Sequence, residues 1–157
     1  MVALRVVVCF AVLAASAVAT NVRQCPGKSI ENLSDNVQLS PCQKPPCKLK
    51  KGTDQSITIN FTPETDIKDV VNKVSADVAG INLPFVGVDG NSICDKIFTE
   101  SGEKASCPVK AGTKYTYKDS FPVYAFYPSL KVKVHWALSN ADTKSDFMCF
   151  EVPAQIA

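Results

Sequence analysis

Residues 130–138 read Leu-Lys-Val-Lys-Val-His-Trp-Ala-Leu, and this stretch decides the fold. Its large apolar side chains recur at every second position: Leu130, Val132, Val134, Trp136 and Leu138. The polar residues Lys131, Lys133 and His135 fall on the opposite face. A period of two is typical of a β-strand with one face in the core and one face in water. We therefore predict a half-buried strand here, in a sheet that is covered on one side.

The same period appears in two earlier stretches. In residues 56–62 the alternation places Ile57, Ile59 and Phe61 inside and Asn60 outside. In residues 70–78 the valines are spaced by four, which taken alone also fits a helix. A helix would put Lys73 and Asp77 beside those valines, whereas a strand separates the two sets. The strand reading, favoured by the β-branched content, has these residues facing in: Val70, Val74, Ala76 and Val78.

We expect further strands over residues 37–39, over 115–127 with a break at Pro122, and over 147–152. Glycine, asparagine and aspartate punctuate the segments between strands, as turn residues do. Six to eight short strands without intervening helices predict an all-β, antiparallel β-sandwich rather than an alternating βαβ fold.

The first 19 residues have the layout of a secretory signal peptide. Arg5 precedes the apolar run 6–15, and Ala17-Val18-Ala19 supplies a small-residue cleavage site after Ala19. A membrane anchor needs about 20 apolar residues, and this run is shorter. We therefore expect an exported single domain over residues 20–157, which at about 138 residues can form one core.

The charge of this domain excludes some partners. Removal of Arg5 leaves 16 basic against 15 acidic side chains. Such a balance argues against a nucleic-acid partner. The cluster Lys44, Lys48, Lys50 and Lys51 leaves two readings open, a solvated surface or an attraction to anionic lipid.

Removal of the leader also removes Cys9, and six cysteines remain. An even number in an exported chain predicts three disulfides, although sequence alone allows 15 pairings. Cys42 and Cys47 enclose a proline turn, and Cys94 and Cys107 flank a polar loop. The remaining pair, Cys25 and Cys149, would then join the two ends of the domain. Structural zinc is the rival reading, but the spacings do not match the usual zinc-ligand pairs.

Two glycosylation sequons fit the same route, one at Asn32 and one at Asn60. Since alternation places Asn60 on the outer face of its strand, we expect Asn60 to be the better acceptor.

Catalytic arrangements are scarce in this sequence. His135 is the single histidine, and it lies on the charged face of its strand. The glycines form neither a phosphate-binding loop nor a nucleophile elbow. We expect no enzyme activity, no cofactor and no metal site.

Two apolar runs, residues 81–88 and 121–128, do not resemble solvated loops. They are rich in aromatic residues and prolines. They either cap the core of a small sandwich or surround a binding pocket.

These runs also carry a family resemblance. It rests on five segments in preserved order: residues 39–49, 83–85, 121–129, 134–136 and 149–156. Together they resemble the small soluble Niemann-Pick type C sterol carriers of the ML lipid-recognition family, across essentially the whole mature chain. The overall sequence favours an arthropod member of this family.

The resemblance implies an immunoglobulin-like sandwich whose lipid enters between two sheets as they part. It implies the same three disulfides as above. The sterol-contact residues of the family fall on Phe85, Val123 and Tyr127. Other residues surround them: Pro122, Pro128, Trp136 and Phe150. Alternation independently places Val123, Ala125 and Tyr127 on one face.

The implied function is a secreted or lysosomal carrier of cholesterol-like sterols, acting as a monomer. Two departures weaken the assignment of the ligand, since Phe150 replaces a tryptophan of vertebrate members and the loop between Cys94 and Cys107 is longer. A carrier or sensor of fatty acids, semiochemicals or microbial lipids is the alternative.

Alternation also assigns Phe126. If Val123 and Tyr127 face the pocket, Tyr124 and Phe126 point away from it. We expect Phe126 to contact a bilayer or a membrane sterol transporter, the alternative being that it packs under a neighbouring loop.

Overall fold

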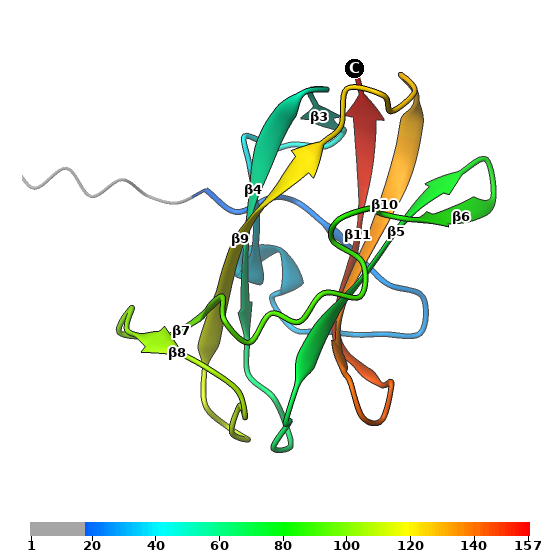
Figure 1. Ribbon diagram of the computed structural model, residues 1–157. Coiled ribbons are helices and arrows are strands. Elements are labelled where there is room, and N and C mark those ends of the chain that lie inside the picture. The colour runs from blue at the N-terminus through cyan, green and yellow to red at the C-terminus, as the bar shows by residue number, and fades with distance from the viewer. Residues whose placement is uncertain (1–17) are drawn as a thin grey trace, which may run out of the picture.

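The computed structural model describes residues 18–157. Most of the expected signal peptide lies outside these residues, and that assignment stays a prediction. The described residues form two β-sheets packed face to face (Figure 1). The all-β sandwich expected from alternation is confirmed.

The larger sheet has the strand order β1-β11-β10-β5-β6, with β3 beside β11. All its pairs are antiparallel except β3 with β11, which is parallel. Its strands are β1 (Arg23–Gln24), β3 (Cys47–Leu49), β5 (Val70–Val78), β6 (Ile81–Pro84), β10 (Lys131–Asn140) and β11 (Asp146–Ile156).

The second sheet has the order β2-β4-β9-β7-β8 and is antiparallel throughout. Its strands are β2 (Val37–Ser40), β4 (Thr53–Phe61), β7 (Ile97–Thr99), β8 (Lys104–Ala105) and β9 (Tyr115–Val123). A short 3₁₀ helix, η1 (Leu33–Asn36), precedes β2.

Strand β10 occupies the centre of the larger sheet, as its alternation predicts. Trp136 lies opposite Phe150 of β11 on one side and opposite Val74 of β5 on the other. All three are buried. The inner faces of these strands form one side of the core.

The expectation for residues 115–127 is wrong in two respects. Pro122 does not break β9, because β7 pairs only with Tyr115–Tyr117 and leaves the far part of β9 as an edge, where proline is tolerated. The strand ends at Val123 rather than Tyr127, and a turn follows in which the Tyr127 amide donates to the Tyr124 carbonyl at 3.1 Å. Ala125 is therefore exposed and does not share a face with Val123.

Within residues 18–157 three disulfides are formed, joining Cys25 to Cys149, Cys42 to Cys47 and Cys94 to Cys107. These are the pairs that the sequence reasoning and the resemblance both favour. The first of them fastens the short strand β1 to β11, across 124 positions of sequence.

Among the described residues, no helix has the length and apolar character needed to cross a membrane.

Candidate ligand pocket between the sheets

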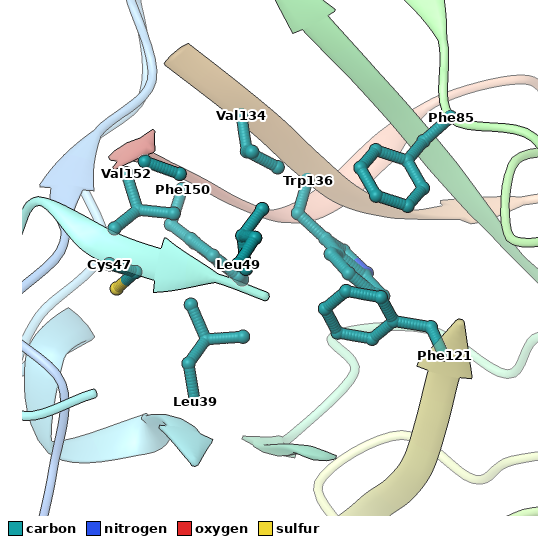
Figure 2. A pocket seen from close by; sticks show the side chains of 10 residues that line it. Leu39, Cys47, Leu49, Phe85, Phe121, Val134, Trp136, Phe150 and Val152 are labelled. Carbon is teal, nitrogen blue, oxygen red and sulfur yellow. The ribbon is translucent and has the colours of Figure 1, made fainter. Parts of the chain in front are cut away.

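A small cavity of about 20 Å³ lies between the sheets. Both sheets contribute to its wall, with most of the side chains coming from the larger one (Figure 2). The ten lining residues are Leu39, Cys47, Leu49, Phe85, Phe121, Val134, Trp136, Phe150, Val152 and Ala154. Every one of them is buried, and none carries a charge.

Phe85 is held beside β5 by one backbone hydrogen bond, and a side-chain bond from the same segment supports it. Its amide donates to the Val74 carbonyl at 2.9 Å. The Val74 amide donates in turn to Asp89 Oδ1 at 2.8 Å. The segment after β6 is thereby fastened along β5, which fixes the Phe85 ring although no strand is formed there.

Aromatic rings follow one side of the cavity, where Figure 2 shows Phe85, Trp136 and Phe121 close together. The Phe85 ring meets Phe121 edge to face at 5.7 Å. Phe121 lies 5.5 Å from Trp136, and Trp136 stacks on Phe150 at 6.4 Å with the planes 8° apart. Offset and edge-to-face contacts of this kind are favourable for aromatic pairs.

Three of the expected ligand-binding residues line the cavity: Phe85, Trp136 and Phe150. Val123 is buried but lies outside the lining set, and Tyr127 covers the Phe85 ring at 5.8 Å. Pro128 is exposed, and Pro122 alternates with the buried Phe121 and Val123 and so faces away.

The other lining residues were not predicted from the sequence to belong to the pocket. The signal for Val134 and Val152 was available, since both occupy inward positions of alternating strands. Leu39 and Leu49 lie on short strands whose position over the cavity follows from the tertiary fold.

The cavity is too small for a lipid as it stands, because binding sites for small molecules measure about 300–1,000 Å³. A volume of about 20 Å³ corresponds to one or two water-sized probes. A lipid can enter only if the side chains of the wall move apart. Since the wall is apolar, a hydrocarbon ligand would replace each lost contact with an equivalent one.

Four apolar side chains on β6, on the segment after it and on the turn after β9 are exposed. We call them the apolar rim: Ile81, Leu83, Val86 and Phe126, each more than half exposed, with Phe126 at 75%. Tyr127 Oη donates to the Val86 carbonyl at 3.5 Å, which brings the two halves of the rim together. Burial raises the pKa of the Tyr127 phenol, so the hydroxyl keeps its proton.

Gly87 allows the Tyr124 ring to lie close to the segment after Phe85. It has a positive φ of 85°, and a Cβ there would lie 3.1 Å from the Tyr124 hydroxyl. Another residue would be strained in its backbone and crowded against Tyr124.

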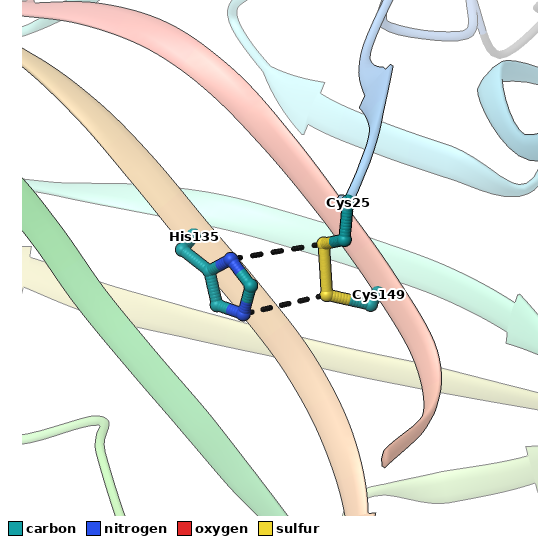
Figure 3. A group of neighbouring side chains, drawn as sticks. All are labelled: Cys25, His135 and Cys149. Atoms are coloured by element: carbon teal, nitrogen blue, oxygen red, sulfur yellow. Dashed lines mark hydrogen bonds between the residues drawn. A yellow bond between two sulfur atoms is a disulfide. The ribbon is translucent and has the colours of Figure 1, made fainter. Parts of the chain in front are cut away.

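His135 lies on the outer face of the larger sheet, over the Cys25–Cys149 disulfide (Figure 3). Its Nε2 is 3.4 Å from Cys149 Sγ, and its Nδ1 is 3.3 Å from Glu151 Oε1. Zinc binds cysteine as a thiolate, and both sulfurs here are joined in a disulfide. This group is therefore not a zinc site in the oxidised protein.

The two sequons differ in exposure. Asn32 is exposed at the start of η1. Asn60 is half-buried on the outer face of β4, and its Oδ1 accepts a hydrogen bond from Thr116 Oγ1 at 2.8 Å. Asn60 faces outward as alternation predicts, yet Asn32 is the more accessible of the two.

Comparisons of this chain with a family model and with known proteins point to the same family. The ML domain model matches residues 19–156. The NPC intracellular cholesterol transporter 2 of Bos taurus is 33% identical over 147 residues, covering 94% of this chain and 93% of its own. The ecdysteroid-regulated 16 kDa protein of Manduca sexta is 30% identical over 145 residues, covering 92% and 94%.

Among solved structures, a Niemann-Pick type C2 protein from the Japanese carpenter ant superposes with a TM-score of 0.66. The match covers 78% of this chain and 89% of the ant protein at 23% identity. At that identity the likeness supports the sandwich fold and nothing finer.

Proposed function

Because this chain belongs to the ML domain family, we propose that it is a lipid carrier which binds a cholesterol-like sterol between its two sheets. The observation that carries the proposal is the inter-sheet cavity, whose ten lining residues are all buried and uncharged. The relative from Bos taurus is named as a cholesterol transporter. A carrier of this kind makes and breaks no covalent bond.

Burial of the sterol supplies the free energy of binding. A sterol buries several hundred Å² of apolar surface, so at about 25 cal/mol/Å² the gross gain is on the order of 10 kcal/mol. The entropy of association and the opening of the wall reduce this gain. Micromolar or tighter binding remains, with the polar end of the ligand at the mouth, where water satisfies it.

The proposed contact residues follow from the geometry. Phe85, Trp136 and Phe150 touch the ligand from the existing wall. Val123 and Tyr127 join them once the sheets part, since Tyr127 lies against Phe85 and Val123 is the next inward residue after Phe121 on β9. Pro122 and Pro128 stay outside the contact set because their side chains lie away from the cavity.

The apolar rim is proposed to dock on the surface of a bilayer. Val86 follows Phe85 in the chain, and Phe126 packs on Tyr127, which contacts Phe85. A lipid leaving the pocket there would pass into the membrane with little exposure to water. Aromatic and aliphatic side chains favour the boundary between headgroups and acyl chains. Phe126, at 75% exposure, is the most accessible member.

Export and cleavage after Ala19 belong to the same proposal, with the secreted fluid or the endosomal and lysosomal lumen as the place of action. Thr20 fits the start of a mature domain. Its hydroxyl accepts a hydrogen bond from the Leu39 amide at 2.7 Å, so the first residue after the cleavage site is already fastened to β2. Asn32 and Asn60 are the proposed glycan acceptors.

One observation favours a second candidate, a carrier of fatty acids or other lipids. The wall offers no directional polar partner for a sterol hydroxyl. Shape and volume then set selectivity, and any apolar ligand of suitable size competes.

Competition binding tests these two candidates. A fluorescent sterol is bound to the protein and followed by energy transfer from Trp136, the single tryptophan of the chain. Displacement by cholesterol, with palmitate and lipopolysaccharide much weaker, supports the sterol carrier. Displacement by palmitate or lipopolysaccharide in preference to cholesterol supports the alternative, and absence of binding by all of them contradicts both.

A further inference from the structure

A line of three hydrogen bonds, two of them fully buried, crosses the sandwich beside the cavity. Trp136 Nε1 donates to Asn72 Oδ1 at 3.0 Å, and Asn72 Nδ2 donates to the Tyr117 hydroxyl at 2.8 Å. Tyr117 donates to Asp119 Oδ2 at 2.9 Å. We call these four residues the polar bridge. Trp136 and Asn72 belong to the larger sheet and Tyr117 to the smaller one, so the bond between Asn72 and Tyr117 ties the two sheets together.

The direction of every bond in the polar bridge is fixed by its ends. The indole N–H of Trp136 can only donate, and the carboxylate of Asp119 can only accept. The Tyr117 hydroxyl therefore donates a hydrogen bond to Asp119 and accepts one from Asn72. Burial raises the pKa of Tyr117, which keeps the phenol protonated. Lys96 Nζ, 3.0 Å from both oxygens of Asp119, holds that carboxylate in place.

The bridge lies in the layer just below the cavity. On three strands the lining set stops at Trp136, Phe121 and Phe150. On β10 and β11 the next inward residues, Leu138 and Met148, are fully or almost fully buried and do not line it. On β9 the next inward residues are two members of the bridge, the half-buried Asp119 and then the fully buried Tyr117. Asn72 is paired directly with Leu138 in this layer.

The cavity and the bridge layer respond differently to a hydrocarbon ligand. Around the cavity, the sheets touch through apolar contacts, which a lipid can replace. In the bridge layer, Asn72, Tyr117 and Trp136 are at most 2% exposed. Separating them would leave buried donors and acceptors without partners, and hydrocarbon cannot satisfy those groups.

We propose that the polar bridge is the fixed floor of the lipid pocket and that Asn72 is a residue determining specificity, because it limits the length of ligand that the pocket accepts. This inference rests on the proposed lipid binding. With the floor fixed, the sheets part only on the side of Phe85, and the alkyl tail of a sterol ends against Trp136.

Two variants remove the floor in different ways. Asn72→Leu replaces the amide with a side chain of similar volume and breaks both of its bonds. Tyr117→Phe removes one oxygen atom and is the milder change. Val70→Ala is the matched control, since Val70 is fully buried on the same face of β5 and takes no part in the bridge.

The first measurement is the affinity for a series of 3β-hydroxysterols: cholesterol, an analogue without the alkyl tail, and an analogue with the tail extended by about three methylene groups. The unsubstituted protein should bind the extended sterol about tenfold more weakly than cholesterol, because the longer tail overpacks a pocket whose floor does not move. In Asn72→Leu and Tyr117→Phe this ratio should fall to about threefold or less. The double variant should add little, since both changes break one connection, and Val70→Ala should keep the original ratio.

The second measurement needs no ligand. Acrylamide quenching of Trp136 fluorescence reports access to the floor, and it should rise clearly in both bridge variants and not in Val70→Ala. Unchanged quenching in both bridge variants overturns the floor, whether or not any sterol binds. If quenching rises but the ratio of affinities for cholesterol and the extended sterol is unchanged, Asn72 does not limit the length of the ligand. If the unsubstituted protein binds no sterol of the series, the lipid proposal fails and quenching alone judges the bridge.

Discussion

Trp136 combines packing and hydrogen bonding at the centre of the proposed site. One face of its indole stacks on Phe150, Phe121 approaches from the other sheet, and its N–H is satisfied by Asn72. A buried tryptophan usually needs such a partner. Its ring orientation is thus fixed independently of any ligand, which suits a residue at the closed end of a pocket.

At the residue scale, Phe85 and Tyr127 give the sharpest test of the pocket wall. Phe85→Ala should weaken sterol binding by about tenfold to a hundredfold, since a buried phenylalanine contributes about 1.5–3 kcal/mol. Tyr127→Ala should weaken it less, because Tyr127 is only half-buried. Equilibrium titration with a fluorescent sterol measures both, with circular dichroism to verify the fold.

Phe98→Ala is the control for these variants. Phe98 lies on β7, away from the cavity, with Lys104 and Lys118 near its ring. Its removal should leave sterol affinity unchanged. If both pocket variants bind sterol as tightly as the unsubstituted protein and remain folded, Phe85 and Tyr127 do not belong to the site.

Part of this site could be predicted from residues alone. Alternation placed Trp136 on the inner face of its strand, the family resemblance assigned Trp136 and Phe85 to the pocket, and both line the cavity. Asn72 was not. It occupies an inward position between Val70 and Val74, and a polar side chain there interrupts the apolar face of the strand. That interruption was the signal, but its partners come from other strands and depend on tertiary packing.

At the scale of elements, the existence of a long strand was easier to predict than the residue at which it ends. β5 covers Val70–Val78, as expected. Strand β9 stops at Val123, where β4 begins at Thr53 and offers no further partner. Strands of two or three residues, such as β1, β7 and β8, are too short for alternation to reveal.

The segment after β9 carries the prediction about docking. Phe126 is exposed and stacks on Tyr124 at 5.2 Å, so it does not pack under a loop. Phe126→Ser should slow sterol transfer between vesicles at least about threefold, through loss of part of the 1.5–3 kcal/mol that a phenylalanine gains on burial. Affinity and stability should change little, because the ring contacts Tyr124 and Tyr127 at the surface and does not line the cavity.

Transfer between protein-free vesicles decides whether the partner is the bilayer itself. An unchanged rate there, with slower delivery only in the presence of a membrane protein, would assign Phe126 to a receptor instead. A loss of several kcal/mol in stability would place Phe126 in the core and remove the docking role.

At the scale of the whole molecule, the Cys25–Cys149 disulfide joins the two ends of the domain. Replacing both cysteines by serine should lower the melting temperature more than replacing Cys42 and Cys47. The entropic model gives about 5 kcal/mol for a separation of 124 residues and about 2 kcal/mol for a separation of 5.

Thermal unfolding of the two double variants measures this order. The reverse order would show that local strain or residual structure in the unfolded chain outweighs the loop entropy. Peptide mapping of the unsubstituted protein verifies the pairing on which the comparison depends.

The central question is whether a lipid lies between the sheets. Photolabelling answers this directly: a sterol with a photoreactive group on its alkyl tail is bound, irradiated and located by peptide mapping. We predict that label concentrates on peptides containing Phe121, Trp136 and Phe150, which line the cavity, and that excess cholesterol suppresses it. Label confined to the apolar rim or to other surface residues, or unaffected by excess cholesterol, would contradict it.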